Sequence, residues 1–104
     1  MDTEAALRQI KNRLQRTYGD HFRGVVLFGS SVRGDASEDS DIDLLVLLTG
    51  PVKFGRDLEL CIDALYPVSL ELGRRISPKP VEEHRFNEYE CPLFEHVKRE
   101  GIRA

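Results

Sequence analysis

The chain has 104 residues, a length that suits one domain with one modest hydrophobic core. Hydrophobic residues make up 40% and charged residues 32% of it, which is typical of a globular protein and argues against a wholly disordered one. The net charge of −3, from 15 basic and 18 acidic residues, excludes a strongly basic nucleic-acid-binding coat and leaves only a local basic patch open. We therefore expect a single domain over residues 1–104.

Neither a membrane nor an oxidising compartment is indicated. No apolar run approaches the roughly 18 residues of a membrane span, and the acidic N-terminus does not resemble a secretory signal. Cys61 and Cys91 are too few and too far apart for a disulfide framework or a zinc pair. We expect both to be reduced, partly buried core residues of a cytoplasmic protein.

The first half of the chain predicts one helix and two buried strands. Apolar residues recur at helical spacing from the N-terminus, and this helix is expected to end at Gly19. The short apolar runs over residues 24–28 and 41–48 are typical of strands that are buried on both faces. A polar loop over residues 29–40 connects them, and it contains two glycines.

The second half predicts a helix, a weaker strand and further helix. The helix is expected over residues 56–73, kinked or split at Pro67. Residues 74–81 carry two prolines, which cannot donate ladder hydrogen bonds, so this segment is predicted as an edge strand. A helical pattern over residues 82–100 is broken near Pro92. The order of elements predicts an α/β fold with helices packed on a small sheet.

Two aspartates stand where the second strand begins. Residues two apart in a strand project to the same face, so the carboxylates of Asp41 and Asp43 should converge. Adjacent carboxylates repel each other unless a cation lies between them, and hard oxygen ligands suit Mg²⁺ or Mn²⁺. Taken alone, the pair could equally be a solvated strand entrance, or it could pair with Arg33 or Arg74.

The loop before these aspartates has the composition of a phosphate cradle. Gly29 allows the backbone to approach a ligand closely, and Ser30 offers a hydroxyl donor. A short helix starting at Ser31 would present free N–H groups to the same place, and Arg33 could add a forked donor for phosphate oxygens. A phosphate cradle facing a metal-binding carboxylate pair predicts a site for a nucleoside triphosphate.

Gly29-Ser30, ten intervening residues and then Asp41-x-Asp43 resemble the signature of the DNA polymerase β-like nucleotidyltransferase superfamily. The short length is similar to its minimal nucleotidyltransferase (MNT) branch. The resemblance implies a nucleotidyltransferase-type fold with a small mixed sheet. It also implies transfer of a nucleotidyl group, with AMP expected first, from ATP or another nucleoside triphosphate to a hydroxyl of a partner protein. It implies that Gly29, Ser30 and Arg33 bind the nucleotide, and that Asp41 and Asp43 are catalytic Mg²⁺ ligands. The implied partner is a helical HEPN-domain protein, as in toxin–antitoxin pairs.

The sequence departs from that family pattern at one place. Active members usually carry a third acidic residue on the next core strand, whereas residues 75–81 contain no carboxylate, and Lys79 there could neutralise phosphate or simply be exposed. The nearest acids in the sequence are Glu71, Glu82 and Glu83, for which solvated helix-end positions are expected. Two alternatives therefore stay open. The domain could neutralise its partner by contact alone, or a second copy or another chain could complete its site.

Overall fold

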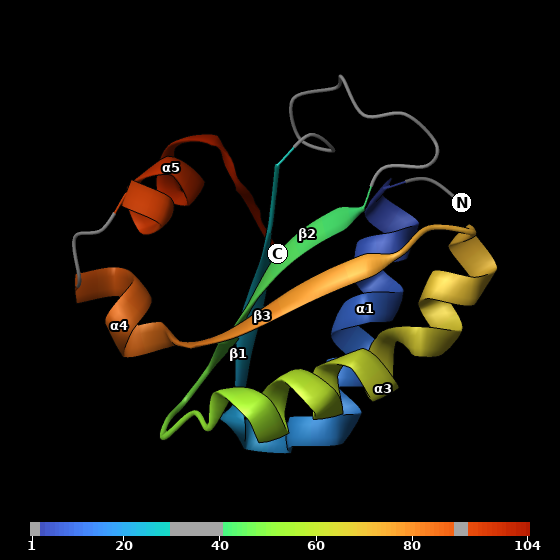
Figure 1. The fold of residues 1–104 in the computed structure, drawn as a ribbon, viewed down its shortest axis with the longest axis horizontal. Helices are drawn as coiled ribbons and strands as arrows, with labels where there is room; N and C mark the ends of the chain where they lie inside the picture. The colour runs from blue at the N-terminus through green and yellow to red at the C-terminus, as the bar shows by residue number, and fades with distance from the viewer. Residues whose placement is uncertain (1–2, 30–40, 89–91) are drawn as a thin grey trace.

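The computed structural model describes residues 3–29, 41–88 and 92–104. In that part of the chain a four-stranded sheet in the order β3-β2-β1-β4 carries helices on both faces (Figure 1). The elements are α1 (Thr3–Tyr18), a 3₁₀ turn η1 (Gly19–His21), β1 (Phe22–Phe28), β2 (Ile42–Leu48), α3 (Phe54–Leu72), β3 (Ile76–Glu82), α4 (Glu83–Glu88), α5 (Pro92–Glu100) and β4 (Ile102–Arg103).

The sheet is mixed, as predicted. β1 runs antiparallel to both β2 and β4, while β2 and β3 are parallel. A parallel pair needs a crossover connection, and the long helix α3 provides it. The carboxylate pair at the start of β2 therefore lies at the same end of the sheet as the start of β3.

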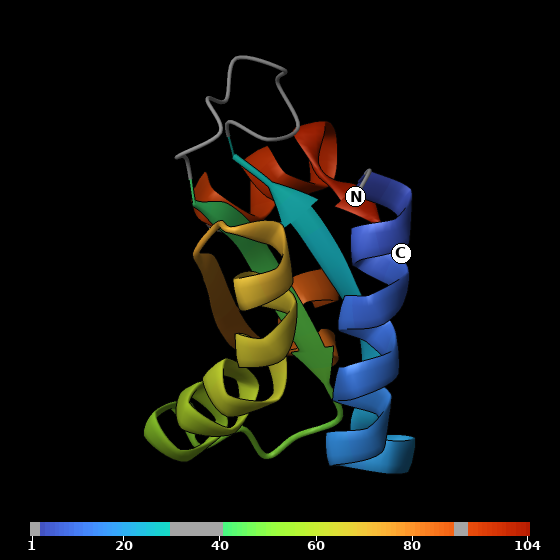
Figure 2. The same cartoon turned by 90° about the vertical axis from the view of Figure 1, so that its right-hand side faces the viewer.

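Helices cover the two faces of the sheet separately. Figure 2 shows α1 and α3 on one face, and α4 and α5 on the other. Alternate residues of β2 pack against the helices on the two faces of the sheet, which explains why the sequence of this strand is an almost continuous apolar run. The larger core under α1 and α3 contains Ile10, Leu14, Val25, Leu27, Ile42, Leu44, Val46, Leu48, Cys61, Leu65, Val68 and Ile76. The smaller core under α4 and α5 contains Val26, Leu45, Leu47, Phe86 and Val97.

Helix α3 differs from expectation in one respect, because Pro67 does not split it. The helix is continuous over Phe54–Leu72, and Figure 2 shows its ribbon changing direction partway along. A proline leaves the carbonyl four residues earlier without its helical donor, here that of Asp63. Both residues are exposed, so water can bind that carbonyl, and the helix bends without ending.

None of the described helices is long and apolar enough to cross a membrane.

The boundaries of other elements differ slightly from the predicted ones. β1 begins two residues earlier than expected, at Phe22, and the two-residue strand β4 was not predicted because so short a strand has no periodicity to detect. The C-terminal helical segment is divided into α4 and α5, as the break near Pro92 predicted. Cys61 is buried and free, which confirms the prediction for this residue, whereas Cys91 lies outside the described residues.

The two prolines of β3 occupy positions that leave its ladder intact. The backbone N–H of Ile42 donates to the carbonyl of Arg75 at 2.8 Å. In a parallel ladder alternate residues direct their peptide groups at the partner, so those of Pro78 and Pro80 point away from β2. β3 is an edge strand, as predicted, and the donors that its prolines lack are on its outer side.

Candidate active site

The two aspartates lie at one end of the sheet. Asp41 directly precedes β2 and is exposed, and Asp43 is the second residue of that strand and is half-buried. Ser77 on β3 stands opposite Asp43 in the strand register, and its hydroxyl donates to Asp41 Oδ2 at 3.3 Å. A single neighbouring residue thus adjoins both aspartates, which places the carboxylates on the same side of the sheet, as their spacing predicted.

Gly29 forms the other wall of this carboxylate site. It follows β1 with a φ of +83°, in the region that favours glycine. A Cβ atom built on Gly29 would overlap Asp43 Oδ2 and would lie 3.3 Å from Asp43 Cγ. Only a residue without a side chain lets the backbone pass so close to this carboxylate. The sequence had assigned Gly29 to close approach of a ligand, and the structure adds that the approach is to Asp43.

Ser77 occupies the place on β3 where a third carboxylate would face the pair. The sequence showed that residues 75–81 lack an acid but not which of them stands opposite Asp43. That residue becomes identifiable once residues 76–82 are aligned in parallel with residues 42–48. The described residues contain no group of three His, Cys, Asp or Glu side chains that could hold a metal ion.

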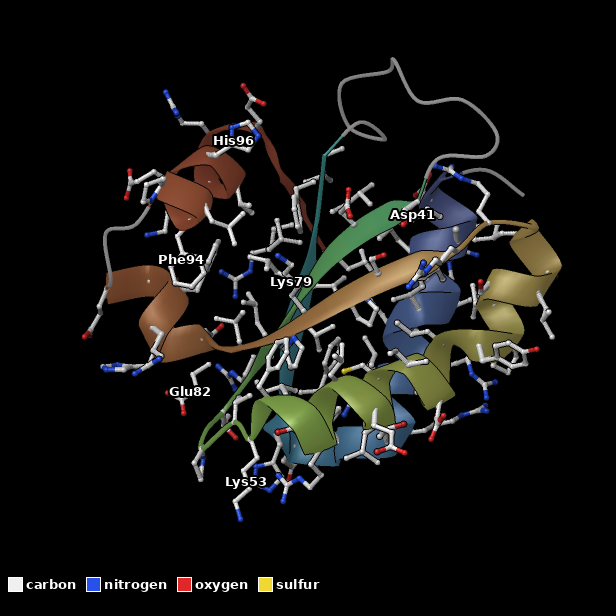
Figure 3. The ribbon with its side chains drawn as sticks, in the orientation of Figure 1. Asp41, Lys53, Lys79, Glu82, Phe94 and His96 are labelled. Atoms are coloured by element: carbon white, nitrogen blue, oxygen red, sulfur yellow. The ribbon has the colours of Figure 1, made fainter. Side chains whose placement is uncertain are left out.

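None of the three glutamates at or near β3 replaces the missing acid. The expected solvated helix-end position is wrong for Glu82, which is the half-buried last residue of β3 because the strand extends one residue further than predicted. Glu82 pairs in register with Leu48, at the opposite end of the strands, and its Oε1 accepts a hydrogen bond from Val52 N at 3.1 Å. Figure 3 shows this separation from Asp41. Glu83 follows Glu82 and is held by arginines, and Glu71 is exposed on α3, which covers the other face of the sheet.

The remaining predicted nucleotide contacts, Ser30 and Arg33, lie outside the described residues, as does the rest of the segment 30–40. The structure therefore brings together Gly29, Asp41 and Asp43 of the predicted site residues. Gly29 and Asp41 are the described residues that flank that segment in the sequence.

A cavity of about 580 Å³ lies on the same face of the sheet as Asp43. Its floor includes Leu45 and Lys79, which are partners in the β2–β3 register, and Leu93 and Phe94 line it from α5. Lys79 is two residues beyond Ser77 on the same strand, so its side chain projects to the same face. In Figure 3, Lys79 lies between the end of the sheet that carries Asp41 and the end that carries Glu82.

A second polar cluster lies at the start of α3, away from the carboxylate pair. Asp57 is 1% exposed, and it accepts hydrogen bonds from the backbone N–H of Lys53 at 2.8 Å and from the Tyr18 hydroxyl at 2.9 Å. Burial, followed by the hydrogen bond to Asp57, raises the pKa of Tyr18, and burial raises the pKa of Cys61 to about 11. The raised pKa values keep the Tyr18 hydroxyl and the Cys61 thiol neutral at physiological pH. The hydrogen bond from Lys53 N to Asp57 satisfies a backbone donor at the start of α3, so it stabilises the first turn of that helix.

Glu83 ties three elements together at the far end of the sheet. Its carboxylate accepts hydrogen bonds from Arg23 Nε on β1 at 3.1 Å and from Arg103 Nη2 on β4 at 2.6 Å. Desolvation alone would raise the pKa of Glu83, but the hydrogen bonds and charges of Arg103 and Arg23 outweigh it and hold that pKa below its usual range. The shift reflects a structural ion-pair network.

Comparisons with known proteins point to one family. The profile of the nucleotidyltransferase domain family matches residues 7–98. A Methanocaldococcus jannaschii protein, provisionally named a protein adenylyltransferase, is 36% identical over 87 residues, covering 84% of this chain and 81% of that protein. The protein adenylyltransferase MntA of Thermococcus cleftensis is 36% identical over 81 residues, covering 75% and 79% of the two chains.

Solved structures share the fold. A chain provisionally described as a minimal nucleotidyltransferase is 30% identical, with a TM-score of 0.59, and the match covers 98% of this chain and 95% of that one. A spectinomycin adenyltransferase of Enterococcus faecalis, solved with ATP and spectinomycin, has a TM-score of 0.71 at 20% identity, and this chain spans 55% of it. A complex of a tri-AMPylated Shewanella oneidensis HEPN toxin with an MNT antitoxin gives a TM-score of 0.61 at 15% identity, covering 96% and 69%. The last two likenesses concern the fold alone.

Proposed function

This chain belongs to the nucleotidyltransferase domain family and to its minimal branch, and from that premise we propose that it transfers AMP from ATP to a hydroxyl group of a partner protein. The observation that carries the proposal is the carboxylate pair of Asp41 and Asp43, fixed between Gly29 and Ser77. Two relatives at 36% identity bear names of protein adenylyltransferases, which supports a protein acceptor.

The donor set at this end of the sheet fits a divalent cation. Asp41 and Asp43 supply carboxylate oxygens on one face, Asp41 is open to solvent, and such hard ligands suit Mg²⁺ or Mn²⁺. A cation held there would neutralise developing charge on the phosphate oxygens. Ser77 has a role of its own, since its hydroxyl orients the Asp41 carboxylate by donating to Oδ2.

The reaction then follows from how the chain would hold its substrate. Gly29, Ser30 and Arg33 would bind the triphosphate, with its α-phosphate turned toward the aspartates. The acceptor hydroxyl attacks the α-phosphorus, the bond from that phosphorus to the bridging oxygen breaks, and pyrophosphate leaves. The acceptor oxygen releases its proton to solvent as the new P–O bond forms. Holding the two reactants in line is the main contribution that a protein can make to such a transfer.

We propose a HEPN-type helical protein as the acceptor. The support is the shared fold with an MNT antitoxin solved together with an AMPylated HEPN toxin. A second function, neutralisation of the partner by contact without transfer, is favoured by Ser77 in place of a third carboxylate. It predicts inhibition of the partner that is indifferent to ATP and to the substitution Asp43→Asn.

The deciding experiment is AMP transfer to the co-purified partner, read as a mass increase on the partner after incubation with ATP and Mg²⁺. We expect the double variant Asp41→Ala/Asp43→Ala to lose transfer by a factor of about 10³ or more, because it removes every described carboxylate of the site. Asp63→Ala, which removes an exposed carboxylate from α3, is the matched control and should transfer normally. Retained transfer in the folded double variant would refute the assignment, and wild-type inhibition without any adduct would favour the contact mechanism.

A further inference from the structure

The site has a different charge balance from one with three carboxylates. Among the described residues Ser77 is the one that faces Asp43 from β3, and it brings a hydroxyl where an acid would bring a negative charge. Two carboxylates attract a divalent cation less strongly than three, and they also repel a triphosphate less strongly. With two carboxylates, therefore, a bound cation contributes less to nucleotide affinity, and less repulsion has to be overcome when no cation is bound.

A positively charged side chain, that of Lys79, lies farther along the same strand. Lys79 is two residues beyond Ser77, a distance of about 7 Å along β3, and it projects to the same face. Its four-carbon side chain is long enough to bring the ammonium group to the neighbourhood of Asp43. Lys79 is exposed, so little desolvation opposes a turn of this side chain toward the aspartates.

The other charged groups around the cavity leave Lys79 available. The cavity is also lined by Glu82 and Arg85, whose side chains approach each other at 3.7 Å. Glu82 accepts a further hydrogen bond from Val52 N. Within the described part of the chain Lys79 forms no ion pair, so its charge is not already neutralised by Glu82.

We infer that Lys79 binds phosphate oxygens of the nucleoside triphosphate directly, so that part of the nucleotide affinity of this chain does not require a divalent cation. The inference rests on the proposed function, because it takes the carboxylate pair as the place of the α-phosphate. An ammonium group binds phosphate as a compact point charge with three donors, which suits the outer phosphates that leave as pyrophosphate. Lys79 thus takes part in substrate binding, and Ser77, by replacing an acid, lowers the dependence of that binding on a metal ion.

The test is calorimetric titration of the purified chain with a non-hydrolysable ATP analogue, in EDTA and in Mg²⁺. We expect measurable binding of the wild type in EDTA, and a dissociation constant about tenfold to a hundredfold weaker in Lys79→Gln. Lys79→Arg should retain most of the affinity, because the charge is kept. Lys53→Gln is the matched control, since Lys53 is exposed and lies at the opposite end of the sheet (Figure 3).

A second variant addresses Ser77. In Ser77→Asp the added carboxylate should weaken binding in EDTA and strengthen the dependence on Mg²⁺, since it raises both repulsion and metal attraction. Absence of wild-type binding in EDTA, or equal binding by Lys79→Gln, would overturn the inference. These outcomes are independent of AMP transfer, because metal-free binding that depends on Lys79 can persist in a chain that transfers nothing, and transfer can occur in a chain whose binding is wholly metal-dependent.

Discussion

Gly29 is the residue on which the shape of the carboxylate site most directly depends. Its positive φ and the space that Asp43 takes beside it both exclude a side chain. We expect Gly29→Ala to lower the free energy of unfolding by about 1–3 kcal/mol, because backbone strain adds to the overlap with Asp43. It should also weaken nucleotide binding by displacing that carboxylate. Urea unfolding and calorimetric titration measure the two effects.

A matched glycine separates these effects from the general cost of adding a methyl group. Gly55 lies in the first turn of α3, and a Cβ atom there meets nothing within 4 Å. Gly55→Ala should therefore stabilise the protein by about 0.5–1 kcal/mol, because alanine favours the helix and restricts the unfolded chain. If Gly29→Ala were as stable as Gly55→Ala, the close approach to Asp43 would not be a constraint.

The sequence was sufficient to predict that Gly29, Asp41 and Asp43 lie together, but not which residues adjoin them. Asp41, Asp43 and Gly29 were predicted from a strand-loop-strand pattern, because side-chain parity and glycine freedom are local properties. The facing of Ser77 and Asp43 depends on the register of two strands separated by the whole of α3. Such a register is set by packing over the entire sheet, so composition and spacing cannot supply it.

The first turn of helix α3 is stabilised by the carboxylate of Asp57, which is almost fully buried. Asp57 accepts hydrogen bonds from Lys53 N and from the Tyr18 hydroxyl, which joins the start of α3 to the end of α1. Asp57→Ala should lower the free energy of unfolding by about 1–3 kcal/mol, because it removes the side-chain acceptor of two partly buried donors. Thermal and urea unfolding test this, and the exposed carboxylate variant Asp63→Ala should change stability by less than about 0.5 kcal/mol. Equal stability of the two variants would contradict a structural role for Asp57.

The elements themselves were largely predictable, for reasons that differ among them. The buried strands β1 and β2 and the helices α1 and α3 follow from apolar periodicity, and β3 was recognised as an edge strand from its prolines. The pattern of α3 also contained Asp57, but nothing local indicated that this one of its acids would be buried. β4 was missed, because two residues acquire strand geometry only from the partner strand β1.

For the molecule as a whole, the site lies at one end of the sheet and the network that fastens the C-terminal elements lies at the other. Glu83 bridges β1 and β4 from the start of α4. Because its folded-state pKa is below the ordinary value of 4.5, Glu83 stabilises the fold fully above that pH. This contribution is lost as pH falls through the lower, folded-state pKa.

We therefore expect Glu83→Gln to lower the free energy of unfolding at pH 7 by about 0.5–1 kcal/mol, a modest value because the pair is partly exposed. The difference from wild type should shrink below pH 4.5 and disappear once the carboxyl is protonated in both states. Urea unfolding from pH 3 to pH 8 provides the measurement. Glu59→Gln, at an exposed position on α3, should follow the wild type at every pH. A pH-independent deficit in Glu83→Gln would show that the side chain acts by packing rather than by charge.

The outward-facing prolines of β3 bear on how this protein behaves in a crowded cell. An extended chain that approached the rim of the sheet would find no amide hydrogen at Pro78 or at Pro80, the two central positions on that side. Backbone pairing, which can recruit one sheet after another into a growing fibre, therefore has no continuous template there. At high concentration this rim should resist aggregation, and a partner that meets the protein there can use side chains and the outward carbonyl groups but not a continuous strand ladder.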